Sequence, residues 1–310
     1  MPLLYQPLSK TGIFLVKSGI ACAALGWLFS QNKLSLDTLL YLEPSRWLMA
    51  LLAALVVSLA FQGLRWWCLL RLNGITLSPG RILVYSWIGH FFQMVTPGTL
   101  GAEAARFYYI TKDVANAKVK TISSVLLDRL IALSAFFMLA LFSVFFWDPT
   151  ILSSSHLWFL VISCVVTMFV TAGIIYKTAQ KKQSASGSDD SPQLSAKEMT
   201  FWICLAFFFS CIAAVFMALS FQITGMVITH PLDFSVAAVH IPFVMIANGI
   251  PITPGGLGLG ESISMLAFTR SGYIHGAELM FIVRLGLLIV RLPGVVFYLG
   301  AGYLEKKGSA

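Results

Sequence analysis

Several charged side chains lie inside long apolar runs of the sequence. Asp128 and Arg129 fall in one such run, and Arg284 and Arg291 fall in another, where their spacing of seven residues places them on one helix face. A charge deep in a bilayer costs about 2.5–3.5 kcal/mol, so it normally pairs or faces a cavity. Because the planar guanidinium group donates two hydrogen bonds to phosphate at once, we expect Arg129, Arg284 and Arg291 to line a polar path for an anionic headgroup.

Two glutamates suggest an alternative role for these arginines. Glu103 and Glu261 each follow a Pro-Gly sequence, and either could bind substrate. They could also pair with Arg129 and Arg284 and only lock the structure together; the two interpretations are compatible. Further candidate substrate-binding residues near these positions are Asp128, Arg106, Gln93 and Asn248.

The glutamates follow a repeated motif. Thr-Pro-Gly-Thr-Leu-Gly at 96–101 matches Thr-Pro-Gly-Gly-Leu-Gly at 253–258. The apolar arm before each motif is short for a membrane span, which needs about 20 residues. Broken backbone at membrane depth is tolerated only where protein covers it or where it lines a cavity. We therefore predict two re-entrant helical hairpins, at 80–112 and 235–270.

The tips of these hairpins are candidate anion sites. A helix that begins after each motif points its free amides and the positive end of its dipole into the membrane, where phosphate could bind. The tip residues are Thr96, Pro97, Gly98, Gly101, Thr253, Pro254, Gly255, Gly256 and Gly258.

The elements that must position these residues are membrane helices. Hydrophobic residues make up 58% of the 310 residues and charged residues 11%, whereas a soluble domain carries roughly 25% charged residues. This composition excludes a soluble enzyme, a disordered chain and a DNA-binding module. Six runs are long enough to cross a bilayer: 13–29, 47–70, 121–147, 157–176, 201–228 and 277–304.

The basic residues predict the topology. If both hairpins return to their own side, most of the 21 Lys and Arg residues fall on the cytoplasmic side, as the positive-inside rule requires. The chain is then a multi-pass protein of the cell inner membrane, with cytoplasmic N- and C-termini. The polar segment 177–200 becomes a flexible cytoplasmic loop.

The two halves of this single membrane domain, 1–310, resemble each other. The hairpin motifs match at an offset of 157, Phe61-Gln62 matches Phe221-Gln222, and an Arg follows each hairpin in the next span. The first repeat, 47–147, begins at the outer face and the second, 201–304, at the inner face. We therefore predict an all-α polytopic membrane protein with six transmembrane helices plus two re-entrant helical hairpins in an inverted-topology repeat, an architecture of many transporters.

Other chemistry finds little support in the sequence. No P-loop or HExxH motif occurs, so we expect no catalytic residue, no cofactor, no metal and no nucleotide or nucleic-acid partner. His90 and His240 are interpreted as hydrogen-bonded core residues. The cysteines, which all lie in apolar runs, are interpreted as buried hydrophobes: Cys22, Cys68, Cys164, Cys204 and Cys211.

The segments 89–106, 126–129 and 250–261 together resemble the flippase-like membrane domain of the lysyl-phosphatidylglycerol synthase/flippase family. The resemblance covers about residues 10–305 and implies a transbilayer lipid mover. In two-domain members the similar region is a flippase for aminoacylated phosphatidylglycerol. Stand-alone relatives are linked to other lipids, including hopanoids and polyprenyl-linked sugars.

The sequence departs from the family pattern near both tips. Gln93 and Thr96 take the places of Asn and Leu in an Asn-x-x-Leu-Pro pattern, and Gly260 stands where an Arg is common. The missing cation argues against a simple transfer of substrate from the family.

We expect a flippase that moves an anionic or phosphate-containing lipid, such as an aminoacyl-phospholipid or a polyprenyl-linked lipid, through a cavity between the hairpins. Its partners would be the lipid substrate and the bilayer, with a homo-oligomer left open. The alternatives are an intramembrane enzyme with Glu103 and Glu261 as acid and base, a small-anion carrier, and a regulatory membrane partner.

Overall fold

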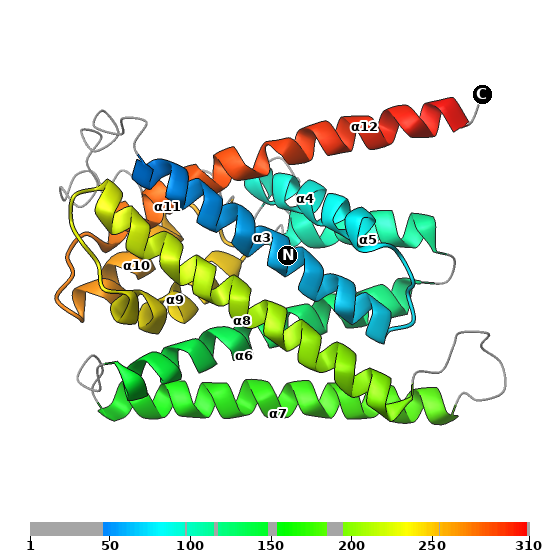
Figure 1. Cartoon of the computed structure of the whole chain (residues 1–310), viewed down its shortest axis with the longest axis horizontal. Helices are drawn as coiled ribbons and strands as arrows, with labels where there is room; N and C mark the ends of the chain where they lie inside the picture. Colours follow the sequence, from blue (N-terminus) through cyan, green and yellow to red (C-terminus); the bar gives the residue numbers. More distant parts are fainter. Residues whose placement is uncertain are drawn as a thin grey trace, which may run out of the picture.

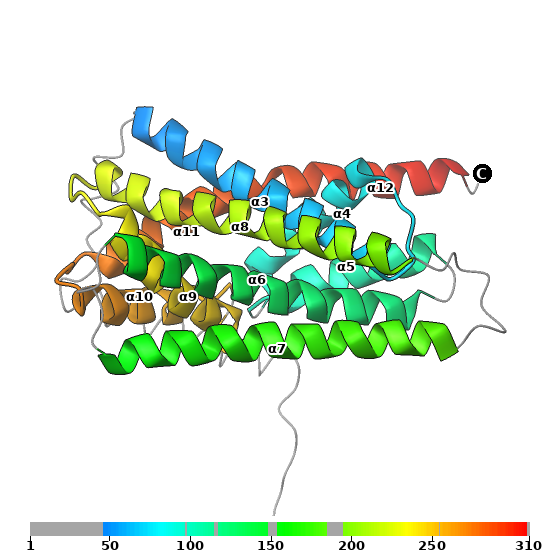
Figure 2. The same ribbon diagram turned by 60° about the horizontal axis from the view of Figure 1, so that its bottom comes forward.

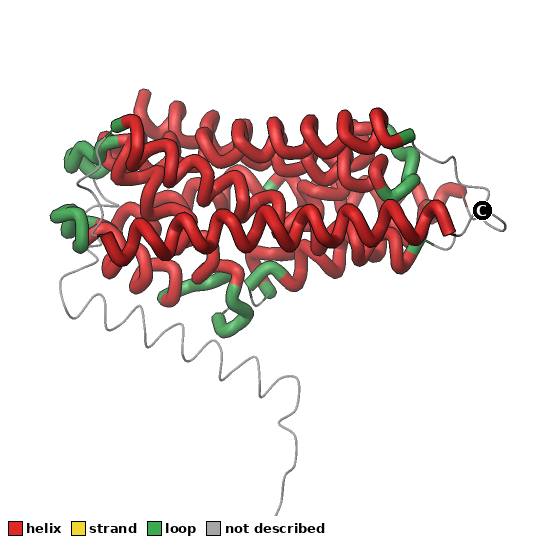
Figure 3. The backbone as a smooth tube through the Cα atoms, turned by 90° about the horizontal axis from the view of Figure 1, so that it is seen from below, coloured by secondary structure: helices red, strands yellow, loops and turns green. Residues whose placement is uncertain are grey.

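The computed structural model describes residues 46–96, 98–114, 117–147, 154–184, 195–253 and 255–308. Within these ranges the regular secondary structure is helical, and the long helices run roughly along a common axis (Figures 1 and 3). The helices are α3 (Arg46–Leu72), α4 (Pro79–Val95), α5 (Leu100–Asp113), α6 (Lys118–Phe146), α7 (Ser154–Ser184), α8 (Ala196–Val227), α9 (Phe234–Gly249), α10 (Leu259–Thr269), α11 (Gly276–Arg291) and α12 (Pro293–Gly308).

Five segments of the described chain are long and apolar enough to cross a membrane. They lie in α3, α6, α7, α8 and the α11–α12 unit, and they correspond to five of the six predicted spans. The remaining predicted span, 13–29, lies outside the described residues. The last span is not one straight helix: α11 ends at Arg291 and Pro293 begins α12, because proline cannot donate the next helical hydrogen bond.

Much of the segment predicted to be a flexible loop, 177–200, is helical. Helix α7 continues to Ser184, and α8 begins at Ala196. Ser195 caps α8 in a capping box: its hydroxyl accepts the amide of Glu198 at 3.2 Å, and the Glu198 carboxylate accepts the amide of Ser195 at 2.7 Å. This local cap, which satisfies two free helix amides, outweighs the polar composition of the segment.

The short helices form two antiparallel pairs, α4 with α5 and α9 with α10. Figure 1 shows them towards opposite ends of the long helices, with the chain turning back between the members of each pair. Ser78 caps α4, and Pro79 occupies its first turn, where the missing amide hydrogen costs nothing. Both turns fall at the repeated Thr-Pro-Gly motif, so the two tips point towards each other in the middle of the bundle.

The centre of the bundle is the packing of α3 against α8. Leu55 and Leu59 of α3 belong to one buried cluster with Met217 and Phe221 of α8, and the Ser58 hydroxyl donates to the Ala213 carbonyl at 2.9 Å. Helix α7 lies at the periphery beside α6 (Figure 2).

The outer surface of α7 is strongly apolar. Its exposed side chains include Trp158, Phe159, Ile162, Val165, Val166 and Phe169. Exposure of an apolar surface of this size to water would be unfavourable, whereas contact with lipid acyl chains would not be.

Candidate functional site

The two hairpin tips are joined by a reciprocal pair of backbone hydrogen bonds. The Gly98 amide donates to the Thr253 carbonyl at 3.3 Å, and the Gly255 amide donates to the Thr96 carbonyl at 2.9 Å. Each donor and each acceptor is the counterpart of the other at an offset of 157 residues. Gly98 and Gly255 also share a left-handed backbone, with φ of +55° and +57°, which side-chain-bearing residues rarely adopt.

A cavity of about 500 Å³ lies beside these tips. Its walls come from α3, α4, α5, α6, α8, α9 and α11. The polar side chains that line it are Gln62, Arg65, His90, Gln93, Thr99, Glu103, Arg106, Asp128, Arg129, Ser210, Asn248, Arg284 and Arg291. Five of these residues are arginines and only two are carboxylates, so the lining has a net positive charge.

Part of the cavity lining is apolar and exposed. Leu100, at the start of α5, is 50% exposed, and Ile246, near the end of α9, is 39% exposed. The cavity thus combines a charged interior with apolar side chains at the surface.

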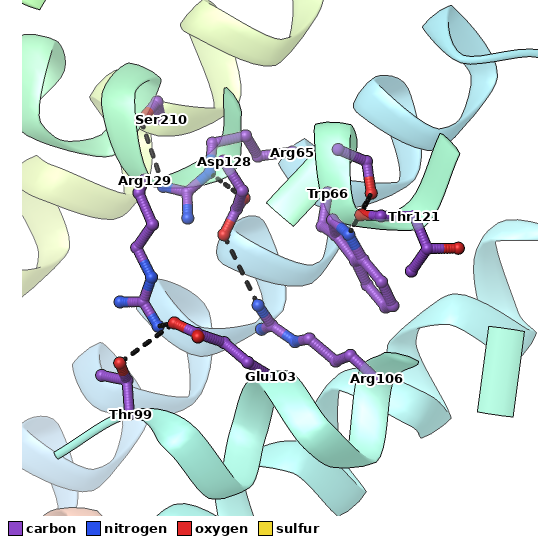
Figure 4. A network of polar contacts seen from close by, with 10 residues as sticks. Arg65, Trp66, Thr99, Glu103, Arg106, Thr121, Asp128, Arg129 and Ser210 are labelled. Carbon is purple, nitrogen blue, oxygen red and sulfur yellow. Dashed lines mark hydrogen bonds and ion pairs between the residues drawn. The ribbon is translucent and has the colours of Figure 1, made fainter. Parts of the chain in front are cut away.

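A buried charge cluster forms one wall (Figure 4). Asp128 of α6 accepts from Arg65 Nε at 2.7 Å and from Arg106 Nη1 at 3.4 Å. All three side chains are almost fully buried. Arg65 also donates to the Ser210 hydroxyl at 3.2 Å, and Arg106 lies 5.0 Å from the Trp66 ring centroid, within range of a cation–π contact.

The count of basic residues in the sequence does not identify Arg65 as a site residue, yet its side chain is buried in the cavity wall. A count of basic residues places Arg65 by its distance along the helix, but its position is set by attraction to Asp128 on another helix. An isolated charge in an otherwise apolar run was the only signal in the sequence that could have identified it.

A second ion pair joins the first hairpin to the next long helix. Arg129 Nη2 lies 2.6 Å from Glu103 Oε1, and the Thr99 hydroxyl donates to the same oxygen at 3.1 Å (Figure 4). The Arg129 and Glu103 side chains are 40% and 30% exposed. This pair is therefore partly exposed, and both of its members line the cavity.

A second Arg–Glu pair, Arg284 with Glu261, is almost fully buried, with side chains that are 10% and 0% exposed. Nε and Nη2 of Arg284 donate to the two carboxylate oxygens of Glu261 at 2.6 and 3.2 Å. The same guanidinium donates to the Asn248 side chain at 3.0 Å, to the Gly256 carbonyl at 3.1 Å and to the Gly255 carbonyl. Its donors are thus committed to the second tip, and each Arg–Glu pair lies within one repeat.

The tip glycines do not offer free amides to a phosphate. Gly98 and Gly255 donate across the tips, as described, and Gly256 donates to the Thr253 carbonyl at 3.1 Å. Gly101 donates to the Thr96 hydroxyl at 2.9 Å, and Gly258 donates to Glu261 at 2.8 Å. The amides of these five glycines therefore already have acceptors within the protein and would have to exchange them to bind an anion. Pro97 and Pro254 lie outside the described residues.

The presence of glycine at position 260 has a steric reason. A Cβ atom at this position would lie 2.3 Å from Asn248 Oδ1 and 2.6 Å from Arg284 Nη2. An arginine here, as is common in the family pattern, would displace the polar network of the second tip. The buried Arg284–Glu261 pair therefore leaves no room for a side chain at position 260.

Three residues of the cavity lining hold buried polar atoms without a partner in the described part of the chain. They are both ring nitrogens of His90, Nε of Arg106 and Nε of Arg291. His90 is buried, as its interpretation as a core residue requires, but no hydrogen bond to either ring nitrogen meets the normal geometric limits within the described ranges. The interpretation is correct for His240, whose Nε2 lies 2.6 Å from the Ser271 hydroxyl.

Arg291 stands out because no carboxylate of the described residues forms an ion pair with it. It occupies the last turn of α11, where the helix dipole stabilises a cation by about 0.3–1 kcal/mol. This gain is smaller than the roughly 2.5–3.5 kcal/mol that a charge costs at membrane depth. Arg291 also lines the cavity, where a polar partner would have room to bind.

The described residues contain no group of three or more His, Cys, Asp or Glu side chains that could hold a metal ion. The four cysteines within the described ranges are free thiols: Cys68 and Cys164 are buried, Cys211 is partly buried and Cys204 is exposed. Cys204 thus differs from the expected buried position, and Cys22 lies outside the described residues.

Apolar helices of membrane-spanning length, paired hairpins and a charged cavity at their tips define a multi-pass helical membrane protein with an internal polar site. The chain belongs to the family described as the lysylphosphatidylglycerol synthase TM region, whose model matches residues 14–294. It is also similar to a UPF0104 membrane protein of Methanocaldococcus jannaschii. The two are 22% identical over 291 residues, which cover 84% of this chain and 85% of the relative.

Proposed function

We propose that this protein is a transbilayer flippase for an anionic or phosphate-containing lipid. The observation that carries the proposal is the cavity at the hairpin tips, where five arginines face two carboxylates and exposed Leu100 and Ile246 lie at the surface. A charged interior with an apolar entrance is complementary to a lipid, whose headgroup is charged and whose chains are apolar. Membership of a family named for lysylphosphatidylglycerol supports a lipid substrate.

In this proposal the two helix pairs are re-entrant hairpins and the halves of the protein form an inverted repeat. The reciprocal hydrogen bonds of Gly98 and Gly255 support this relation, since they are what a two-fold axis through the tips would produce. Transporters with inverted repeats and broken helices bind their substrates near the midplane between the repeats, which is where the cavity would lie.

The distribution of basic residues supports an orientation. Arg71, Lys112, Lys118 and Lys197 are found where helices end or begin at one end of the bundle, and Arg46 begins α3 at the other. The positive-inside rule assigns the first end to the cytoplasm. In the proposed arrangement, which includes the predicted span at 13–29, both chain termini are cytoplasmic and the protein resides in the inner membrane.

The proposed mechanism moves the headgroup through the cavity while the acyl chains stay in lipid. The tip-to-tip hydrogen bonds join two hairpins that would enter from opposite membrane faces, so these bonds would break and re-form as the headgroup passes. No covalent step is involved, and the protein is not an enzyme in this proposal. Movement would be passive or driven by the membrane potential or an ion.

The test is leaflet exchange of headgroup-labelled lipids in proteoliposomes of the full chain. Phosphatidylglycerol, aminoacyl-phosphatidylglycerol and a polyprenyl phosphate are compared, with protein-free vesicles as the blank. We expect exchange of at least one lipid, reduced by Arg129→Gln and unchanged by Arg46→Gln, which removes an exposed cation outside the cavity.

Two other outcomes favour the alternatives. A lipid whose mass changes during the assay would identify an intramembrane enzyme. Uptake of a soluble organic phosphate without exchange of any lipid would identify a small-anion carrier. No exchange of any lipid, with or without a membrane potential, would contradict the proposal for these substrates.

A further inference from the structure

The unpartnered polar atoms of the cavity are concentrated on three residues, His90, Arg106 and Arg291. His90 is 3% exposed and Arg106 is 4% exposed, and all three residues line the cavity. Buried polar atoms without a partner are rare in folded proteins and call for a specific explanation, such as a bound ligand or water.

One turn of α4 brings these residues together. A Cβ atom on Gly89 would lie 3.0 Å from the Ala102 carbonyl oxygen and 3.4 Å from Cγ of Arg106, so this turn packs directly against α5. On the same turn, Trp87 Nε1 donates to the Val290 carbonyl at 3.0 Å, which fixes the turn to the end of α11. His90 follows Gly89, and Arg291 follows Val290, so the imidazole belongs to the turn that links the two arginine-bearing helices.

The positive charge around this turn is not fully compensated. Arg284 is bound by Glu261 on two sides, and Arg129 is paired with Glu103. Arg106 shares Asp128 with Arg65, so two cations face one carboxylate. Arg291 has no carboxylate partner among the described residues. The excess charge of the cavity therefore lies near His90 and not at the Arg129–Glu103 and Arg284–Glu261 pairs.

We infer that His90, Arg106 and Arg291 form the seat for the phosphate group of the transported lipid. The inference rests on the proposed function and specifies its site. Arginine gives phosphate charge-assisted hydrogen bonds, and an imidazole donates one more. Arg129 and Arg284 hold the hairpins, whereas these three residues contact the substrate. A phosphodiester of a lipid and a free phosphate share this chemistry, and the experiment separates them.

The experiment measures binding of phosphatidylglycerol to the full chain, purified in an uncharged detergent, by native mass spectrometry over a lipid titration. We expect Arg291→Gln and His90→Phe each to weaken binding by about tenfold or more, the effect of losing a hydrogen bond to a charged group. His90→Gln keeps a donor and should retain most of the affinity. Arg71→Gln is the matched control, because Arg71 also has a buried Nε without a partner but does not line the cavity.

A thermal unfolding curve without added lipid establishes that each variant is folded. Wild-type affinity in folded Arg291→Gln and His90→Phe would overturn the inference, and continued lipid exchange by the wild type would show that the proposed function survives. Displacement of the lipid by inorganic phosphate at equal concentration would overturn the lipid assignment in favour of a free anion. A wild type that neither binds nor moves any anionic lipid would overturn the proposed function itself.

Discussion

Gly98 and Gly255 are related by the internal repeat and also meet in space: each donates its amide hydrogen to the threonine carbonyl two residues before the other. Their φ angles differ by only two degrees, at +55° and +57°. This relationship connects the two halves of the chain through the residues that end the apolar arms. Both halves therefore need glycine at this position, because the positive φ angle is unfavourable for other residues.

Replacing the tip glycines with alanine should destabilise the fold. The left-handed backbone costs a side-chain-bearing residue about 1–2 kcal/mol. Gly98→Ala should cost more than Gly255→Ala, because its Cβ would lie 2.9 Å from the Gly249 carbonyl oxygen whereas the nearest atom at Gly255 is 3.5 Å away. The free energy of unfolding in mixed micelles measures this. Gly80→Ala is the control, since nothing lies within 4 Å of its Cβ; equal losses for all three would contradict the argument.

The two Arg–Glu pairs should differ sharply in their contribution to stability. Arg284→Gln leaves the fully buried Glu261 without its cation and should cost about 3–5 kcal/mol of unfolding free energy. Arg129→Gln removes one partner of a partly exposed pair and should cost no more than about 1 kcal/mol. Denaturant titration of both variants checks the difference. Similar losses of unfolding free energy in the two variants would contradict the argument that exposure determines how much each pair contributes to stability.

The Asp128 cluster should tolerate complete removal better than partial removal. Asp128→Asn leaves Arg65 and Arg106 buried together without a counter-charge and should cost about 3–5 kcal/mol. The triple change Arg65→Met, Arg106→Met, Asp128→Leu should recover most of this loss, because apolar side chains of similar size need no desolvation of charge.

Stability and function should separate in that triple variant. It retains the fold but loses a cationic wall of the cavity, so we expect lipid exchange to fall while the unfolding curve stays close to that of the wild type. Exchange at the wild-type rate would remove this cluster from the proposed path.

Tethering the hairpin tips should stop lipid movement. Thr96→Cys and Thr253→Cys, introduced together in a background without native cysteines, place one thiol on each tip beside the cross-tip hydrogen bonds. A short, reducible bifunctional reagent should block exchange in proteoliposomes, and reduction should restore it. Each single cysteine variant, treated in the same way, is the control. Full exchange by the cross-linked protein would show that the tips need not separate.

The proposed orientation makes a labelling prediction. Lys197→Cys near the start of α8 should react with a membrane-impermeant maleimide only from the cytoplasmic side, and Thr269→Cys at the end of α10 only from the outside. Both side chains are exposed, so the reagent reaches them in either orientation. Labelling of both from one side would contradict the arrangement of opposed hairpins.

The sequence alone specified the helical elements and the places where they break. Apolar run length and composition give membrane-length helices, and the Thr-Pro-Gly motifs mark the turns between α4 and α5 and between α9 and α10. These features are local, since each depends on a few neighbouring residues and their backbone preferences. The same local reasoning underestimated the lengths of α7 and α8. For α8 the reason is the capping box at Ser195, which starts the helix within a polar sequence.

Only the tertiary structure decided which partner each charge meets. Asp128 pairs with Arg65, 63 residues away, and not with its neighbour Arg129, because adjacent residues on a helix point in different directions. His90 remains without a hydrogen bond, and the tip amides are taken by the protein's own oxygens, because helix crossings bring distant groups within a few ångströms. Hydropathy determines that a residue lies in the membrane-spanning bundle; the packing of the bundle determines whether that residue closes a structure or faces a cavity.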